Sequence, residues 1–322
     1  MGLLRIMENT LKNVNPLVFQ HFSGSDSPFL LENESEYQNW RAIRLEHYQR
    51  LNPARIINIA DASSFSVETQ QNLATQMQAF NFAFFEIDRG RYLLSRRDFL
   101  ILGSRLGLHR FESSPDQEMD GVTALKAVDA SDKRSMYIPY SSRALNWHTD
   151  GYYNPTSDRI GAFLLYCVNP AHQGGDSFLL DHEMLYLQIR DTAPELLVAL
   201  MDPAVMVVPA NVQNGQVIRP AESGPVFSVD SESGRLAMRY SSRPRYISWK
   251  SDELTKQAVD LVTELLGDNE FAVSLKLKRG QGIICNNVLH GRKAYADGST
   301  DEASRLYYRA RYYDTVSFAD YA

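Results

Sequence analysis

The sequence has few cysteines, no long apolar run and no dense cluster of basic residues. Only Cys167 and Cys285 occur among 322 residues, and both lie in apolar stretches. Such cysteines are typical of buried, reduced thiols rather than of a secreted disulfide framework, so a cytoplasmic location is expected. No stretch approaches the roughly 20 apolar residues that a membrane span needs. Polar residues soon interrupt the N-terminal segment, which argues against a signal peptide.

The charge balance is mildly acidic, with 33 basic and 39 acidic residues and a net charge of −6. Because no run of lysine or arginine offsets this balance, we expect neither a nucleic-acid groove nor attraction to an anionic membrane surface. The hydrophobic content of 44% and the charged content of 22% are those of an ordinary globular protein. The length allows one or two domains.

Helical spacing dominates the first third of the chain. Aromatic and aliphatic residues recur at helical spacing over 35–51. Ser66 can cap a second helix, and Ser95 with Asp98 has the spacing of a capping box for a third. Short strands are expected at 55–61 and 82–87.

From about residue 120 the pattern changes to short β-rich pieces separated by Gly, Pro or Asp. One late helix is expected over 251–267, with Ser251 as its N-cap and Gly267 as its end. Strands with flanking helices favour a β-sandwich or barrel with helical buttresses. Since no linker is evident, we expect a single unit in which residues 1–60 form a helical elaboration. The β-rich pieces lie at 160–168, 176–181, 204–210, 224–230, 236–241, 272–277, 282–287 and 306–314.

His148 and Asp150 stand two positions apart, so on a strand they would share one face and could grip one ion. The alternative is a hydrogen-bonded pair at the end of a strand. A second β-like run ends in His290, directly before Gly291, where a side chain can face into a barrel. Two imidazoles and one carboxylate leave three coordination positions free. That is the ligand set of the non-heme Fe(II) oxygenases.

The order of motifs resembles the iron(II)- and 2-oxoglutarate-dependent dioxygenases of the taurine dioxygenase family. The stretches "WHTDGYYNP", "GGDS", "VLHGRKAY" and "SRLYYRARYYD" are closest to its gamma-butyrobetaine hydroxylase branch. These motifs lie within 146–314, and residues 60–145 match in general layout only. The resemblance implies a double-stranded β-helix (a jelly-roll, cupin-like core) over residues 61–322.

The resemblance also assigns roles. It implies that His148, Asp150 and His290 are the iron ligands and that Arg305 binds the far carboxylate of 2-oxoglutarate. A guanidinium fork suits a carboxylate, which would be costly to bury unpaired. Ser177 is expected to donate a hydrogen bond to the same cosubstrate. Arg309 meets the anionic group of the substrate in some relatives and is structural in others.

These assignments have simpler alternatives. Arg305 and Arg309 could belong to an exposed strand, and Ser177 could be only a turn residue. His172 and His182 flank a turn and a helix start, where capping is their expected role.

Many relatives carry Asp-Asn or an arginine just before the distal histidine, whereas this chain has Cys-Asn-Asn-Val at 285–288. The difference puts the hydrogen bonding around the metal ligands in question. Asp150 is retained, however, and halogenating relatives replace that carboxylate by a small residue. Hydroxylation or a related oxidation is therefore expected.

The implied reaction uses Fe(II), 2-oxoglutarate and O2 and releases succinate and CO2, with hydroxylation, desaturation or demethylation of an unactivated C–H bond. The expected substrate is a small polar metabolite such as an amino acid, a betaine or another carboxylate. Tyr152 and Tyr153 could cage a quaternary ammonium by cation–π attraction, with Tyr137 and Tyr140 nearby. The alternative is that they are packing residues. The candidate partners for an anionic group are Arg143, Arg239, Arg243 and Arg309.

Three other functions remain open from the sequence. A non-redox cupin-like metalloprotein, an isomerase or hydrolase, would need the metal ligands but not Arg305. A non-catalytic binding module would need none of these residues together. A hydroxylase of protein or peptide side chains would keep the chemistry, but the chain shows no recognition module. The sequence does not reveal the oligomeric state, for which a dimer is the default expectation.

Overall fold

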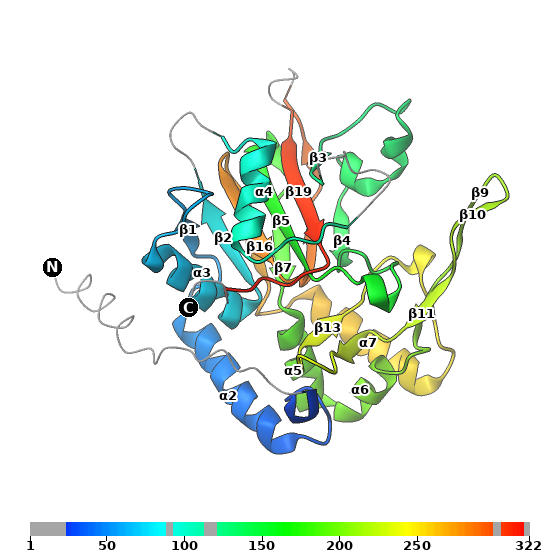
Figure 1. The fold of residues 1–322 in the computed structure, drawn as a ribbon. Helices are drawn as coiled ribbons and strands as arrows, with labels where there is room; N and C mark the ends of the chain where they lie inside the picture. The colour runs from blue at the N-terminus through cyan, green and yellow to red at the C-terminus, as the bar shows by residue number, and fades with distance from the viewer. Residues whose placement is uncertain (1–23, 88–92, 113–120, 299–303, 319–322) are drawn as a thin grey trace.

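The computed structural model describes residues 24–87, 93–112, 121–298 and 304–318, and two sheets form its centre (Figure 1). The larger sheet has six strands in the order β1-β2-β16-β5-β19-β3, and the smaller has four in the order β15-β7-β17-β4. Only β1 and β2 pair in parallel among the described pairs. The expectation of mixed β-structure with flanking helices is thus confirmed.

The α-helices are α2 (Glu34–Arg50), α3 (Val67–Phe80), α4 (Arg96–Arg105), α5 (His182–Thr192), α6 (Pro194–Leu200) and α7 (Glu253–Gly267). The strands of the two central sheets are β1 (Ile56–Asn58), β2 (Phe82–Glu86), β3 (Thr123–Leu125), β4 (Leu145–His148), β5 (Ala162–Asn169), β7 (Ser177–Leu180), β15 (Val273–Leu275), β16 (Gln281–Cys285), β17 (Leu289–Arg292) and β19 (Leu306–Tyr312).

Short strands form four smaller sheets among the described residues. They are β6 (Gln173–Gly174), β8 (Met206–Val208), β9 (Asn211–Gln213), β10 (Gln216–Arg219), β11 (Glu222–Gly224), β12 (Phe227–Val229), β13 (Leu236–Met238), β14 (Ser248–Trp249) and β18 (Tyr295–Ala296). The 3-10 turns are η1 (Gly24–Asp26), η2 (Lys133–Met136), η3 (Ile138–Tyr140), η4 (Thr156–Asp158) and η5 (Pro244–Tyr246).

Strand β2 shows how the larger sheet is buried on both faces. Phe82 and Phe84 join the apolar cluster that the two central sheets enclose. Ala83 and Phe85 point the other way, into a second cluster with α3 and α4. All four side chains have 0% exposure. This explains why the sequence of β2 is a continuous apolar run instead of the alternation of a half-exposed strand.

Helices α3 and α4 cover the outer face of the larger sheet (Figure 1). The expected caps are confirmed: the Ser66 side chain accepts a hydrogen bond from the Thr69 N–H, and Ser95 with Asp98 forms a capping box. At Gly103, an added Cβ would collide with the Tyr312 hydroxyl on β19. The missing side chain therefore lets α4 lie close against the sheet.

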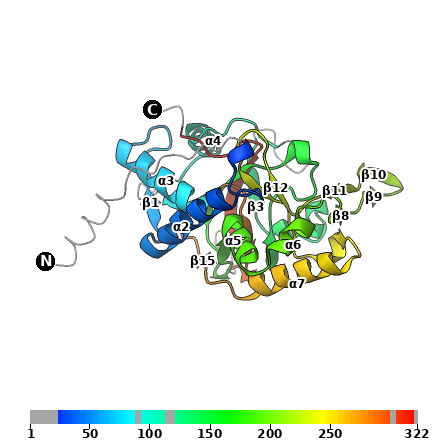
Figure 2. The same cartoon turned by 90° about the horizontal axis from the view of Figure 1, so that it is seen from below.

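A third apolar cluster joins α2, α5, α6 and α7 with the short strands β8, β12 and β13 (Figure 2). The sequence predicted one late helix in the β-rich part, which was wrong because α5 and α6 are also helical. In α5 the consecutive residues Met184, Leu185, Tyr186 and Leu187 are all buried. A helix buried on most sides lacks the one-sided apolar stripe that identifies an amphipathic helix.

The boundaries of two helices refine the sequence expectations. Asp252, and not Ser251, caps α7, because its carboxylate accepts a hydrogen bond from the Thr255 N–H. Gly267 is the last residue of that helix. The expected helix start at 181–183 is present, but its cap is Asp181 and not His182: the Asp181 side chain accepts a hydrogen bond from the Glu183 N–H, whereas the His182 Nε2 contacts the Leu236 oxygen.

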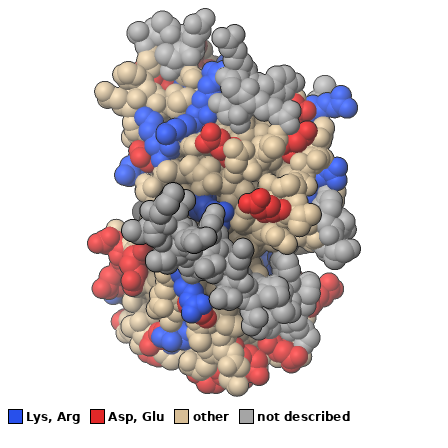
Figure 3. All heavy atoms as spheres, turned by 90° about the vertical axis from the view of Figure 1, so that its left-hand side faces the viewer, with Lys and Arg blue, Asp and Glu red and all other residues tan. Residues whose placement is uncertain are grey.

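The surface carries both signs of charge. Figure 3 shows basic and acidic side chains scattered over one face of the molecule.

The hairpin β9–β10 projects from the body in two views (Figures 1 and 2). No helix in the described ranges is long and apolar enough to cross a bilayer. Cys167 and Cys285 are both free and buried, as expected.

The position of Phe84 between the two sheets predicts a large effect of truncation. We expect Phe84→Ala to lower the free energy of unfolding by about 3–5 kcal/mol, because it leaves a cavity in a packed core. Denaturant titration followed by circular dichroism measures this loss. Val67→Ala is the matched control, since Val67 is 72% exposed. Equal effects of the two substitutions would contradict the burial of Phe84.

Candidate metal centre

The structure brings His148, Asp150 and His290 together. One ligand atom from each lies within 4.8 Å of the other two. His148 ends β4 and His290 lies on the neighbouring strand β17, where the two residues are direct antiparallel partners. Their ring centroids are 4.3 Å apart, and the His148 Nε2 is 3.9 Å from the Asp150 Oδ1. The expected convergence of the three residues is therefore present, although Asp150 lies in the turn after β4 and not on the strand itself.

Backbone carbonyls set the orientation of both imidazole rings. The His148 Nδ1 lies 2.9 Å from the Asn146 oxygen, and the His290 Nδ1 lies 2.9 Å from the Val288 oxygen. A carbonyl oxygen can only accept, so Nδ1 carries the proton in each ring. Each Nε2 is left with a free lone pair, as a metal ligand requires.

The Cys-Asn-Asn-Val sequence before His290 differs from that of many relatives. In this chain, Asn287 supplies hydrogen bonds that position the ligand candidate Asp150. Its Oδ1 accepts from the Asp150 N–H at 2.7 Å, and its Nδ2 donates to the Asp150 and Ile160 oxygens at 3.0 and 2.9 Å. Asn287 has a φ of 49°, in the left-handed region that asparagine tolerates better than most residues. The side chain thus fixes the backbone of Asp150 from both sides.

Burial and neighbouring charges give the three groups the ionisation that a metal site needs. Burial, aided by the nearby His290, lowers the pKa of His148 to about 3, and burial lowers the pKa of His290. Both rings are therefore neutral at pH 7. Burial alone would raise the pKa of Asp150, but Arg309 and Arg311 outweigh it and hold this pKa below its ordinary value. Two neutral imidazoles and one carboxylate fit a divalent metal ion.

Arg311 is a site residue that sequence reasoning missed. Its Nη1 lies 3.6 Å from the Asp150 Oδ1 and donates to the Tyr153 hydroxyl at 3.2 Å, and its Nη2 pairs with Glu112. Arg309 approaches the same Asp150 oxygen at 3.5 Å, while its buried Nε has no partner. Alternation along the strand was the signal, because positions 309 and 311 of β19 share one face.

Arg305 is buried beside this site, with 3% exposure. Its guanidinium carbon lies 3.9 Å from the centre of the Tyr307 ring, and its Nε and Nη1 have no hydrogen-bond partner. Buried guanidinium nitrogens without partners fit a missing carboxylate. The alternative that Arg305 belongs to an exposed strand is therefore wrong. Its surroundings fit the far carboxylate of 2-oxoglutarate.

Ser177 begins β7, where it is buried and pairs with Arg292 of β17. Directly opposed residues of neighbouring strands project to the same face of a sheet. The hydroxyl of Ser177 therefore belongs to the face that carries His290, two residues before Arg292. It is a strand residue and not part of the preceding turn.

Arginines surround Tyr152 and Tyr153, whose rings meet edge to face at 5.3 Å. The guanidinium carbon of Arg219 lies 5.9 Å from the centre of the Tyr153 ring. Burial raises the pKa of Tyr152, and the charge of half-buried Arg243 opposes part of this rise. Arginine side chains thus lie near both tyrosines.

Arg239 is already occupied by the backbone. Its three nitrogens donate to the Tyr152, Met206 and Glu222 carbonyls at 2.7, 3.2 and 3.0 Å. These bonds connect the segment after the HxD motif to β8 and β11. Arg239, one of the arginines expected to meet an anion, thus uses its guanidinium group to hold these backbone segments together.

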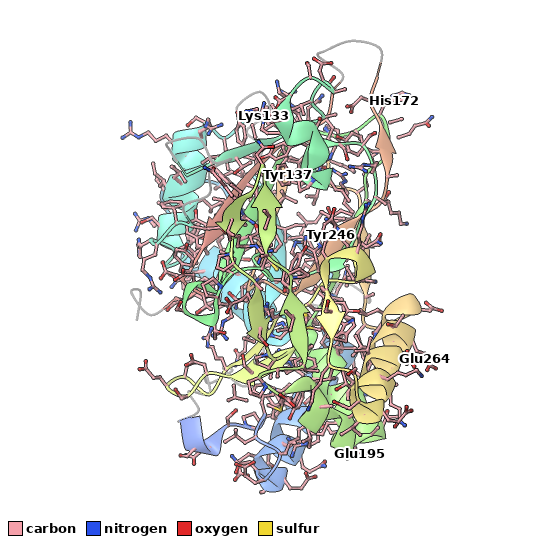
Figure 4. All side chains as sticks on the ribbon, turned by 90° about the vertical axis from the view of Figure 1, so that its right-hand side faces the viewer. Lys133, Tyr137, His172, Glu195, Tyr246 and Glu264 are labelled. Carbon is pink, nitrogen blue, oxygen red and sulfur yellow. The ribbon has the colours of Figure 1, made fainter. Side chains whose placement is uncertain are left out.

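Several residues considered from the sequence lie away from the three ligand candidates. His182 is buried and its Nε2 contacts the Leu236 oxygen at 3.1 Å, while His172 is exposed at the edge of the molecule (Figure 4). Tyr137 is 42% exposed, and Tyr140 packs in the core between the sheets. A cavity of about 880 Å³ has Asn286 and Asn287 in its lining but none of the three ligand candidates.

With this geometry in place, comparison with known proteins identifies the family. The Taurine catabolism dioxygenase TauD, TfdA family matches residues 46–310. The chain belongs to this family. The predicted resemblance to taurine dioxygenase-type enzymes is confirmed at this level, and with it the expectation of a non-heme iron, 2-oxoglutarate-dependent dioxygenase. The finer prediction of the gamma-butyrobetaine hydroxylase branch stays a prediction.

Two curated relatives of this TauD/TfdA-family chain are uridine-5'-phosphate dioxygenases. The protein from Amycolatopsis sp is 30% identical over 172 residues, which cover 52% of this chain and 60% of the relative. The protein from Streptomyces sp is 29% identical over 188 residues, which cover 56% of this chain and 66% of the relative. The matches thus span less than two thirds of the length of either relative.

A solved structure shares the fold. The non-heme iron oxygenase OrfP, in complex with Fe and alpha-ketoglutaric acid, superposes with a TM-score of 0.59 at 16% identity. The superposition covers 79% of this chain and 82% of OrfP. At this identity the likeness concerns the fold.

The contacts of Asn287 generate a prediction for metal affinity. We expect Asn287→Ala to weaken binding of Fe(II) or Co(II) by about 10–100-fold, because the backbone of Asp150 loses its fixed position. Anaerobic titration followed by calorimetry measures the affinity. Asn286→Ala is the matched control, since Asn286 bonds to Val316 and Asn81 and to none of the ligand candidates. Equal affinities of Asn287→Ala and the unaltered protein would contradict this role.

Proposed function

We propose that the protein is an Fe(II)- and 2-oxoglutarate-dependent dioxygenase that oxidises a C–H bond of a small anionic metabolite, with nucleoside monophosphates as the first class to test. His148, Asp150 and His290 would hold the iron, and Arg305 with Ser177 would hold 2-oxoglutarate. When bound, these groups and O2 supply the oxidising power for hydroxylation and leave succinate and CO2. The central sheets would form the jelly-roll core characteristic of such enzymes.

The observation that carries the substrate class is the concentration of arginines beside the metal ligands. Arg219 and Arg311 contact Tyr153, while Arg243 acts on His148 and Tyr152. A quaternary ammonium placed against these tyrosines would be repelled by the guanidinium groups. The aromatic cage suggested by the gamma-butyrobetaine resemblance is therefore less favoured than an anion site.

A phosphate monoester suits this environment better than a single carboxylate. It brings close to two negative charges and three acceptor oxygens, which arginines bind with charge-assisted hydrogen bonds. The names of the two uridine-5'-phosphate dioxygenases support the same class. Amino acids and other carboxylates, the class expected from the sequence, would draw on the same candidate arginines and serve as comparison substrates.

The chain's residues have distinct tasks in this reaction. Arg309 and Arg311 keep Asp150 ionised and ready to bind metal. Arg243, whose charge acts on Tyr152, would hold the substrate's anionic group and orient its target carbon toward the iron. Arg219 already donates to the Pro209 and Pro220 carbonyls, and Arg311 already pairs with Glu112, so these two would add charge more than free donors. Holding reactants in fixed positions in this way is a principal source of catalytic rate.

Anaerobic addition of Fe(II) and 2-oxoglutarate tests the cofactor assignment. We expect a weak visible charge-transfer band that is lost in Asp150→Ala and strongly weakened in Arg305→Ala. Glu264→Ala and Arg50→Ala are matched controls that remove an exposed carboxylate and an exposed guanidinium. Metal binding without any band in the unaltered protein would favour the non-redox cupin-like alternative.

Succinate production with a substrate panel tests the anion assignment. Uridine 5'-phosphate, uridine, an amino acid and gamma-butyrobetaine form the panel. We expect kcat/KM for the phosphorylated nucleoside to exceed that for uridine by about 10–100-fold, the value of one or two hydrogen bonds between charged groups. Arg243→Gln should raise KM for the nucleotide while leaving the charge-transfer band intact. Equal use of uridine and its phosphate would contradict the proposed substrate class.

A further inference from the structure

A second buried arginine lies beside Arg305. Arg292, at the end of β17, is 6% exposed, and its guanidinium carbon lies 4.6 Å from the centre of the Tyr295 ring. The guanidinium carbon of Arg305 lies 5.1 Å from the same ring. One tyrosine thus contacts two buried guanidinium groups.

Neither guanidinium forms an ion pair with a carboxylate of the described residues. Asp297 is the acidic group nearby: its carboxylate accepts a hydrogen bond from the Arg305 backbone N–H at 2.8 Å, and its charge acts on Arg292. Arg292 Nη2 donates to the Ser141 and Arg143 carbonyls at 2.8 and 2.5 Å. Its Nε has no partner, and neither do the Nε and Nη1 of Arg305 or the Tyr295 hydroxyl. Four buried polar atoms around one ring are therefore unsatisfied.

Two neighbouring buried cations are unfavourable without an anion. Arginine remains protonated in proteins, so both groups keep their charge. A carboxylate placed between them would relieve their repulsion and satisfy the free donors.

The strand geometry orients Arg292 toward the cosubstrate pocket. His290 and Arg292 are two residues apart on β17, so they share a face and are separated by about 6.6 Å along the strand. Ser177 lies opposite Arg292 on β7. A ligand that chelates a metal at His290 and extends along this face would bring its far end toward Arg292.

We propose that Arg292 acts with Arg305 to bind the far carboxylate of 2-oxoglutarate, with the Tyr295 hydroxyl as a further donor. The inference rests on the proposed function, and it makes the cosubstrate site a two-arginine site. It also gives Arg292 a second task, because the same side chain fixes Ser141 and Arg143 just before β4. Binding of the cosubstrate would then stabilise the segment that leads into the HxD motif.

The test compares two keto acids that share a metal-chelating end. 2-Oxoglutarate carries the far carboxylate, whereas 2-oxovalerate has a methyl group in its place. Dissociation constants of both are measured by anaerobic calorimetry on the Fe(II)-loaded protein. The substitution is Arg292→Gln, because an amide can still donate to the Ser141 and Arg143 carbonyls. Arg50→Gln is the control for loss of an exposed guanidinium.

We expect Arg292→Gln to weaken 2-oxoglutarate binding at least about tenfold and to change 2-oxovalerate binding less than about twofold. Arg292→Lys, which restores the charge, should recover part of the loss and serves as the test variant if the Gln variant does not fold. Unchanged 2-oxoglutarate binding, or equal weakening of both keto acids, would overturn the proposal. The second result would mean that Arg292 acts only through the 141–143 segment.

The same experiment separates this inference from the proposed function. If the unaltered protein does not bind 2-oxoglutarate, the proposed function itself fails. If Arg305→Gln weakens 2-oxoglutarate binding and Arg292→Gln does not, only the role of Arg292 is overturned.

Discussion

The antiparallel pairing of β17 with β4 on one side and β7 on the other is the constraint on which the site depends. It sets His290 opposite His148 and Arg292 opposite Ser177. Because opposed residues project to the same face, one register determines both the candidate metal centre and the far end of the cosubstrate pocket. A shift of one residue in β17 would turn His290 away from His148.

A second feature of the site is its uneven charge. The whole chain is acidic, yet the interior around the three ligand candidates collects arginines. Arg309 and Arg311 compensate Asp150, and Arg311 is in turn paired with Glu112. Arg292 and Arg305 form no such ion pair among the described residues, and Asp297 offsets only part of their charge. The molecule thus concentrates positive charge in the places where anions would bind, and its exterior carries mixed charge.

Part of this arrangement could be predicted from the sequence, and part could not. The HxD spacing, the position of His290 and the caps at Ser66 and Ser95 are local patterns with a direct physical meaning. The start of α5 was expected, but its length escaped prediction because its apolar residues surround it, so no periodic stripe is visible. Arg311 was overlooked although alternation along β19 places it on the face of Arg309. The unpaired state of Arg292 depends on contacts between strands distant in the sequence, which no local pattern reveals.

Asn287 holds residue 150 through its backbone N–H and C=O, so these hydrogen bonds do not depend on the identity of the side chain there. The Asp150 carboxylate pairs instead with Arg309 and Arg311. A shorter side chain at position 150 would keep the backbone hydrogen bonds and leave the two guanidinium groups with one negative charge fewer. A small inorganic anion would restore that balance beside His148 and His290.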